Sequence, residues 1–121
     1  MQNENLKTTT YKFAFVVDGD VGMSLTLGQN QDLAKQVACM RSNPEIIEVE
    51  PNHGDLAKFN FVNNGIINWT IDFNDNPSSH GFIACLRSNP KIIEVSNTHP
   101  VRSGWIYDGV NFHEPIIGHE S

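Results

Sequence analysis

The side chains best suited to chemistry in this sequence include four carboxylates near predicted turns, Asp18, Asp20, Asp72 and Asp75. Carboxylate oxygens are the ligands that calcium prefers, so this group raises the question of a cation site. In a similar segment 46 residues further along, Asn64 replaces Asp18 and Ile66 replaces Asp20. A tight turn accepts Asp or Asn, whereas a cation site would lose its charge. We therefore predict turns here and no metal site.

The histidines and cysteines do not form a catalytic or metal-binding pattern either. No two histidines have ligand spacing on one predicted element. Cys39 and Cys85 lie among apolar residues of predicted helices, which indicates buried free thiols and fits a reducing place of synthesis. The sequence has no glycine-rich phosphate loop and no nucleophile elbow. We predict no cofactor and no enzymatic activity.

The four aspartates and the two cysteines lie within a sequence repeat that organises the chain. The stretch Ala38–Val49 recurs as Ala84–Val95, and the offset of 46 holds well beyond it. Residues 12–49 align with residues 58–95 without a gap, and 16 of the 38 positions are identical. An unbroken register of that length indicates an internal duplication.

Each copy is predicted to open with a β-hairpin. The first has Tyr11–Val17 and Val21–Leu27 around Asp18-Gly19, and the second offers Asn64-Gly65 at the equivalent place. Both dipeptides favour a tight two-residue turn, because they tolerate positive φ.

Two registers remain open for this hairpin. A two-residue turn sets Val16 opposite Val21 but puts Phe13 and Phe15 on the face away from Met23 and Leu25. A three-residue turn would bring both phenylalanines onto the Met23 and Leu25 face. Turn chemistry favours the first register, and hydrophobic patterning favours the second.

A helix and a third strand complete each copy. Both predicted helices end at Arg-Ser-Asn-Pro, where Arg suits the helix dipole, Asn tolerates a left-handed cap and Pro stops the helix. Glu45–Val49 and Lys91–Val95 follow as strands, so each copy has the order β-β-α-β. Local ion pairs within a copy, Arg41 with Glu48 and Arg87 with Glu94, could brace helix against strand.

The predicted fold class is α+β, a pseudo-symmetric tandem duplication of a β-β-α-β unit with a C-terminal β-hairpin. Each unit should have a small sheet with a helix on one face and a right-handed crossover, and the two units should share one core. In the hairpin, a two-residue turn at Asp108-Gly109 places Trp105 opposite Phe112. The predicted segments are a flexible arm (1–10), the first unit (11–54), the second unit (55–99), the hairpin (100–113) and an extended tail (114–121).

Charge and hydropathy narrow the class of partner. The formal net charge of −6 and the scattered lysines and arginines count against nucleic acid, which needs a basic face. No apolar run approaches the roughly 18 residues that a membrane helix needs, and the first residues lack the apolar core of a signal peptide. We expect no nucleic-acid and no membrane partner.

The end of the chain carries a resemblance to a known group of proteins. Residues 104–112 follow the pattern Gly-Trp-x-Tyr-Asp-Gly-x-x-Phe, after the strand–Asp-Gly–strand opening and the stretch Ser-Asn-Pro-x-Ile-Ile-Glu-Val. Together these features resemble small proteins of contractile-tailed bacteriophages, notably those that infect marine cyanobacteria. In those relatives a single β-β-α-β unit runs into the hairpin, and residues 58–112 follow that plan. The resemblance implies a virion protein, made in the host cytoplasm, in the capsid decoration, neck, baseplate or tail.

The expected function is therefore non-enzymatic assembly through contacts with other virion proteins, in several copies per particle. The alternative is a small soluble phage factor that binds and modulates a host protein. The side chains predicted to contact a partner are aromatic or aliphatic: Phe13, Phe15, Phe59, Phe61, Trp105, Tyr107, Phe112, Ile116 and Ile117.

Overall fold

The computed structural model describes residues 10–28 and 31–115 of the chain. This part of the protein is an α+β fold with two helices and two antiparallel sheets. The first copy of the repeat supplies β1 (Tyr11–Val17), β2 (Asp20–Leu27), α1 (Leu33–Arg41) and β3 (Glu45–Val49). The second supplies β4 (Ala57–Asn63), β5 (Ile66–Phe73), α2 (Ser79–Arg87) and β6 (Lys91–Val95), and β7 (Ile106–Tyr107) and β8 (Phe112–His113) follow. The predicted order β-β-α-β is confirmed in both copies.

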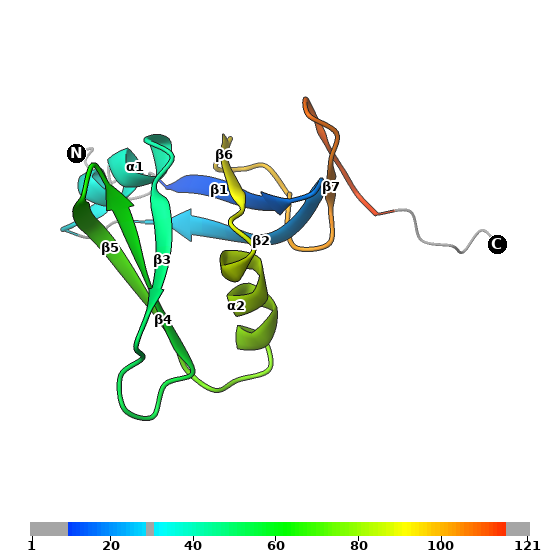
Figure 1. Cartoon of the computed structure of the whole chain (residues 1–121). Coiled ribbons are helices and arrows are strands. Elements are labelled where there is room, and N and C mark those ends of the chain that lie inside the picture. The colour runs from blue at the N-terminus through cyan, green and yellow to red at the C-terminus, as the bar shows by residue number, and fades with distance from the viewer. Residues whose placement is uncertain (1–9, 29–30, 116–121) are drawn as a thin grey trace, which may run out of the picture.

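Each sheet combines strands from both copies, as Figure 1 shows. One sheet has the order β6-β1-β2-β7-β8, and the other has the order β3-β4-β5. The third strand of each copy thus leaves its own hairpin and pairs antiparallel with the hairpin of the other copy. The expectation that each unit builds its own sheet, with a crossover through its own helix, is wrong. Either hairpin could accept either third strand, because the two third strands share the sequence Ile-Ile-Glu-Val.

The helices are exchanged in the same way. α1 follows β2 in the chain and contacts β4, β5 and β6 of the other copy as well as β2 of its own, whereas α2 follows β5 and contacts β1 and β2. We call β1, β2, α2, β6, β7 and β8 lobe A, and β3, β4, β5 and α1 lobe B. Each lobe therefore joins a hairpin from one copy to the helix and third strand of the other.

Two ion pairs connect the lobes. The Arg41 guanidinium donates to both carboxylate oxygens of Glu94, from Nε at 2.7 Å and from Nη2 at 2.8 Å. Arg87 holds Glu48 in the same two-bond geometry at 2.8 and 2.7 Å. The local pairs Arg41–Glu48 and Arg87–Glu94 expected from the sequence are therefore wrong. Each arginine, at the end of its helix, thus reaches the third strand of the other copy.

A β-bulge satisfies both registers that the sequence left open. Asp18 and Gly19 adopt positive φ values of 50° and 84° in a two-residue turn, so Val16 lies opposite Val21. The register then shifts between Phe15 and Val16, and Phe15 lies opposite Met23. Gly22 is the extra residue of this bulge. Turn chemistry fixes the tip of the hairpin, and the bulge turns the phenylalanines to the core side.

The second hairpin repeats this arrangement. Asn64 and Gly65 take positive φ values of 53° and 79°, and the register shifts between Phe61 and Val62. Asn68 is the extra residue here, at the position equivalent to Gly22. The same device in both copies brings the core phenylalanines of each hairpin to the same side of its sheet.

The helix ends follow the sequence prediction. Both helices end at arginine, Arg41 in α1 and Arg87 in α2. The asparagines two residues later, Asn43 and Asn89, adopt left-handed φ values of 53° and 54°. Such a residue reverses the chain after a helix and leads it into the following strand.

A single buried cluster contains residues of both copies. It includes Phe13 and Phe15 of the first copy, Phe59 and Phe61 of the second, and apolar residues of both helices, among them Met40. A smaller cluster lies on the other face of lobe A. Within residues 10–28 and 31–115, no helix has the length and apolar character needed to cross a membrane.

Candidate functional site

The four hairpin phenylalanines predicted to contact a partner lie in the core. Their exposed fractions are 1% or less for Phe13, Phe15, Phe59 and Phe61. A partner could reach them only if the protein unfolded, so the prediction that they form a binding surface is wrong. The reason is the β-bulge, which turns them away from the outer face of each sheet.

The outer face of lobe A is covered by the chain's own C-terminal segment. Ala14, Val16 and Val21 are buried there beneath Val101 and Trp105. The backbone fixes this cover: Val21 N–H donates to the Trp105 carbonyl at 2.8 Å, and Gly104 N–H donates to the Val21 carbonyl at 2.9 Å. Trp105 is 8% exposed, so it closes the lobe.

His99 contributes to this cover as a structural residue. Its ring lies edge-on to Trp105 at 6.0 Å and to Phe112 at 5.6 Å between ring centroids. Its Nδ1 accepts a hydrogen bond from the Val101 N–H at 3.0 Å, and its carbonyl accepts one from the Lys12 ammonium. These contacts occupy the imidazole and hold the chain against β1.

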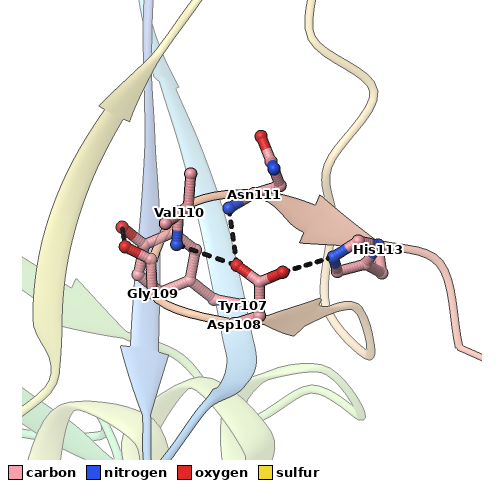
Figure 2. Close-up of polar contacts among 6 residues, drawn as sticks. All are labelled: Tyr107, Asp108, Gly109, Val110, Asn111 and His113. Carbon is pink, nitrogen blue, oxygen red and sulfur yellow. Dashed lines mark hydrogen bonds and ion pairs between the residues drawn. The ribbon is translucent and has the colours of Figure 1, made fainter.

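The C-terminal hairpin differs in register from the prediction. Tyr107 lies opposite Phe112, with ring centroids 4.6 Å apart, so the prediction that Trp105 faces Phe112 is wrong. The cause is a wider loop that Asp108 closes (Figure 2): its Oδ1 accepts the N–H of Asn111 at 2.7 Å and of Val110 at 2.8 Å.

The same carboxylate also holds His113, whose Nε2 lies 2.7 Å from Asp108 Oδ2 (Figure 2). The Asn111 N–H, the His113 ring and the Val110 N–H together lower the pKa of Asp108 to about 2. Asp108 thus organises a loop. Tyr107 and Phe112 stay half-buried and in reach of a partner, whereas Ile116 and Ile117 lie outside the described residues.

The outer face of lobe B is equivalent to the covered face of lobe A but has no such cover among the described residues. Ile47 is 39% exposed and Ile67 is 54% exposed, with Val62 half-buried between them. Val62 lies beside Ile67 on β5, and Glu45 of β3 flanks it. We call Ile47, Val49, Val62 and Ile67 the open face.

The centre of this region is polar. Asn60 stands where lobe A has the buried Ala14, and Thr70 donates to its Oδ1 at 2.8 Å. This bond gives a partner to the Thr70 hydroxyl and to the Asn60 side-chain oxygen. Val62 and Ile67 lie near the β4–β5 turn, whereas Val49 pairs with Lys58 at the other end of β4.

The edge of lobe B at β5 is also more apolar than its counterpart on β2. Ile66 is 63% exposed and replaces the charged Asp20, which pairs with Ile106 of β7. Trp69 and Ile71, further along β5, are half-buried. The sequence prediction assigned no partner contact to these residues, although the alignment of the two copies already showed Ile66 in place of Asp20.

The two cysteine thiols lie in the interior of the protein. Cys39 and Cys85 are free and buried, as predicted. Burial raises the pKa of the Cys85 thiol to about 11 and raises that of Cys39, so both stay protonated near neutral pH. Among the described residues, no three histidine, cysteine or acidic side chains gather as a metal site would require.

Comparison with known proteins returned no matching family model, no matching curated protein and no matching solved structure.

Proposed function

We propose that this chain is a non-enzymatic bacteriophage virion protein that acts through contacts with other virion proteins. One observation carries the proposal. Of two equivalent sheet faces, one is covered by the chain's own residues 101–112, and the other, the open face, has exposed isoleucines. Apolar side chains gathered on one face favour a protein partner. The resemblance of the hairpins and the chain end to small proteins of tailed phages supports a partner in the virion.

The exchanged architecture supports an origin by duplication. In this arrangement the helix and third strand of a β-β-α-β unit pack on the hairpin of another unit. A single unit would therefore need a second copy of itself. We infer that single-unit relatives form dimers by exchanging these elements, and that this chain is such a dimer made in one polypeptide. Fusion removes the association step and lets the two lobes diverge, so that one is closed and the other is open.

The proposed contact with other virion proteins is centred on the open face. Tyr107 and Phe112 offer a second, smaller contact surface. Burying a half-exposed isoleucine recovers part of the roughly 1.5–3 kcal/mol that full burial of such a side chain provides. Several such side chains in one patch suffice for a specific contact when many copies act together on a lattice.

Mass spectrometry of purified, nuclease-treated and salt-washed particles tests the proposal. We expect the chain at a fixed ratio to the major capsid protein, and the ratio then indicates a head or a tail position. Absence from washed particles would refute the proposal and favour the soluble factor that modulates a host protein.

A surface variant then tests the open face itself. Ile47→Lys places a charge where an apolar contact is proposed, and we expect its amount per particle to fall at least tenfold. Gln31→Lys, at another exposed position, changes the net charge equally and should assemble normally. Equal incorporation of both variants would show that the open face is not the contact.

A further inference from the structure

The edge strand β5 of lobe B has little of the protection that keeps a sheet edge from pairing with another chain. It runs for eight residues, Ile66–Phe73, and Asp72 is its only charged residue. The outer strands β3 and β6 are shorter, at five residues, and each contains two charged residues. Short length, charge and β-bulges are the usual protection of a sheet edge against pairing with another chain, and β5 has only Asp72 and the bulge at Asn68.

The equivalent strand in lobe A takes an added strand. β7 pairs antiparallel with the start of β2, where Ile106 lies opposite Asp20. Tyr107 N–H also donates to the Gly19 carbonyl at 2.8 Å. The start of β2 therefore has a partner strand at this edge. The equivalent edge of β5 has no partner strand within residues 10–28 and 31–115.

Two side chains at the start of β5 are more apolar or more exposed than their counterparts on β2. The exposed residue Asp20 becomes Ile66, and Val21, which is 2% exposed, becomes Ile67, which is 54% exposed. An edge that only met water would gain nothing from replacing a carboxylate by isoleucine. A strand added along β5 would shield these side chains.

We propose that β5 pairs antiparallel with β5 of a second copy of this chain, about a two-fold axis. In the register centred on Thr70, Trp69 faces Ile71 of the second copy, and Asp72 faces the neutral Asn68. Asp72 would meet its own copy only in a register centred on itself, so no like charges face each other in the register centred on Thr70. An isologous contact of this kind closes at two copies.

The dimer joins two three-stranded sheets into one sheet of six. The open faces of both copies then lie on the same side of that sheet. This arrangement does not depend on the virion role, but it would present two identical contact sites to neighbouring lattice proteins.

Cross-linking of the purified full-length chain tests the pairing. A cysteine at the two-fold axis meets its own copy at the separation a disulfide requires, so Thr70→Cys should form a disulfide dimer under mild oxidation. Ser24→Cys is the matched control, because Ser24 is the equivalent residue on β2. The two native cysteines are buried and contribute little. Equal cross-linking of the two variants, or none with Thr70→Cys, would overturn the proposal.

Sedimentation analysis supplies a second test. We expect the unsubstituted protein to sediment with a concentration-dependent mass that approaches twice that of the chain. Added salt should strengthen association, because each copy carries a net charge of −6. Ile67→Lys should weaken association about tenfold or more, since it buries a charge at the edge. Val110→Lys, which replaces a 79% exposed apolar residue with the same change of charge, should not.

A chain that stays monomeric at every concentration, or loses association equally in both lysine variants, would refute the β5 dimer. These measurements use purified protein, so their failure is distinct from absence of the chain in phage particles.

Discussion

Replacement of Gly22 by alanine probes the bulge of β2 and the packing of α2 against it. A Cβ atom at this position would lie 2.6 Å from Cys85 Sγ and 2.9 Å from Cys85 Cβ. Non-bonded carbon atoms normally approach to about 3.5–4.0 Å. Cys85 is 5% exposed and lies on the buried side of α2, so it cannot move aside without shifting the helix.

The expected cost follows from two opposing effects. Insertion of a methyl group into a packed site destabilises a protein by about 1–3 kcal/mol. Loss of backbone freedom in the unfolded chain returns about 0.4–1 kcal/mol when alanine replaces glycine. We therefore expect the free energy of unfolding to fall by about 1–2 kcal/mol.

Gly81→Ala is the matched control, because the same substitution should have the opposite sign. Gly81 lies in α2, and a Cβ atom there meets nothing within 4 Å. Alanine is better than glycine inside a helix by about 0.5–1 kcal/mol, so this variant should be more stable.

Urea unfolding followed by tryptophan fluorescence measures both effects. A double-mutant cycle with Cys85→Ala then isolates the contact, because removing Sγ should recover part of the loss caused by Gly22→Ala. If Gly22→Ala is as stable as the unsubstituted protein, or if Cys85→Ala recovers nothing, the close packing of α2 on the bulge is wrong.

Two further predictions concern charged groups. A double-mutant cycle in urea unfolding should give a small favourable coupling between Arg41 and Glu94, which are partly exposed, and none between Arg41 and Glu48. The reverse result would restore the local pairing. The pKa of Asp108 is lowered to about 2 in the folded protein, so its contribution to loop stability is complete above its ordinary value near 3.8 and is lost as pH falls through about 2. The amide signal of Asn111 in NMR should shift with a midpoint near pH 2, and a midpoint near 4 would contradict the loop geometry.

Local interactions let the sequence determine much of this protein. Asp18-Gly19 sets a two-residue turn, and Arg-Ser-Asn-Pro ends each helix, because these residues act on neighbours in the chain. The third strands Glu45–Val49 and Lys91–Val95 were predicted with their observed bounds. The buried state of Cys39 and Cys85 followed from their apolar surroundings on each helix.

Local sequence patterns did not predict the β-bulge at Gly22. Turn chemistry and hydrophobic patterning gave contradictory registers, and only the packing of Phe15 into the shared core requires one extra residue on β2. The wider loop at Asp108 has a similar cause, because the carboxylate accepts two backbone N–H groups instead of leaving a two-residue turn. Each outcome depends on contacts that a pattern of residue types does not specify.

The partner of each third strand was decided by the tertiary structure alone. Residues 46–49 and 92–95 are identical, so each strand fits either hairpin equally well by its own sequence. The choice depends on where the helix before it packs and on the path from α1 into β3 and from α2 into β6. That choice pairs Arg41 with Glu94, buries the four phenylalanines between the lobes, and leaves only one sheet for the C-terminal segment to cover. Ile66 and Ile67 stay exposed because residues 101–112 cover the face of lobe A, and no other part of residues 10–28 and 31–115 covers the equivalent face of lobe B.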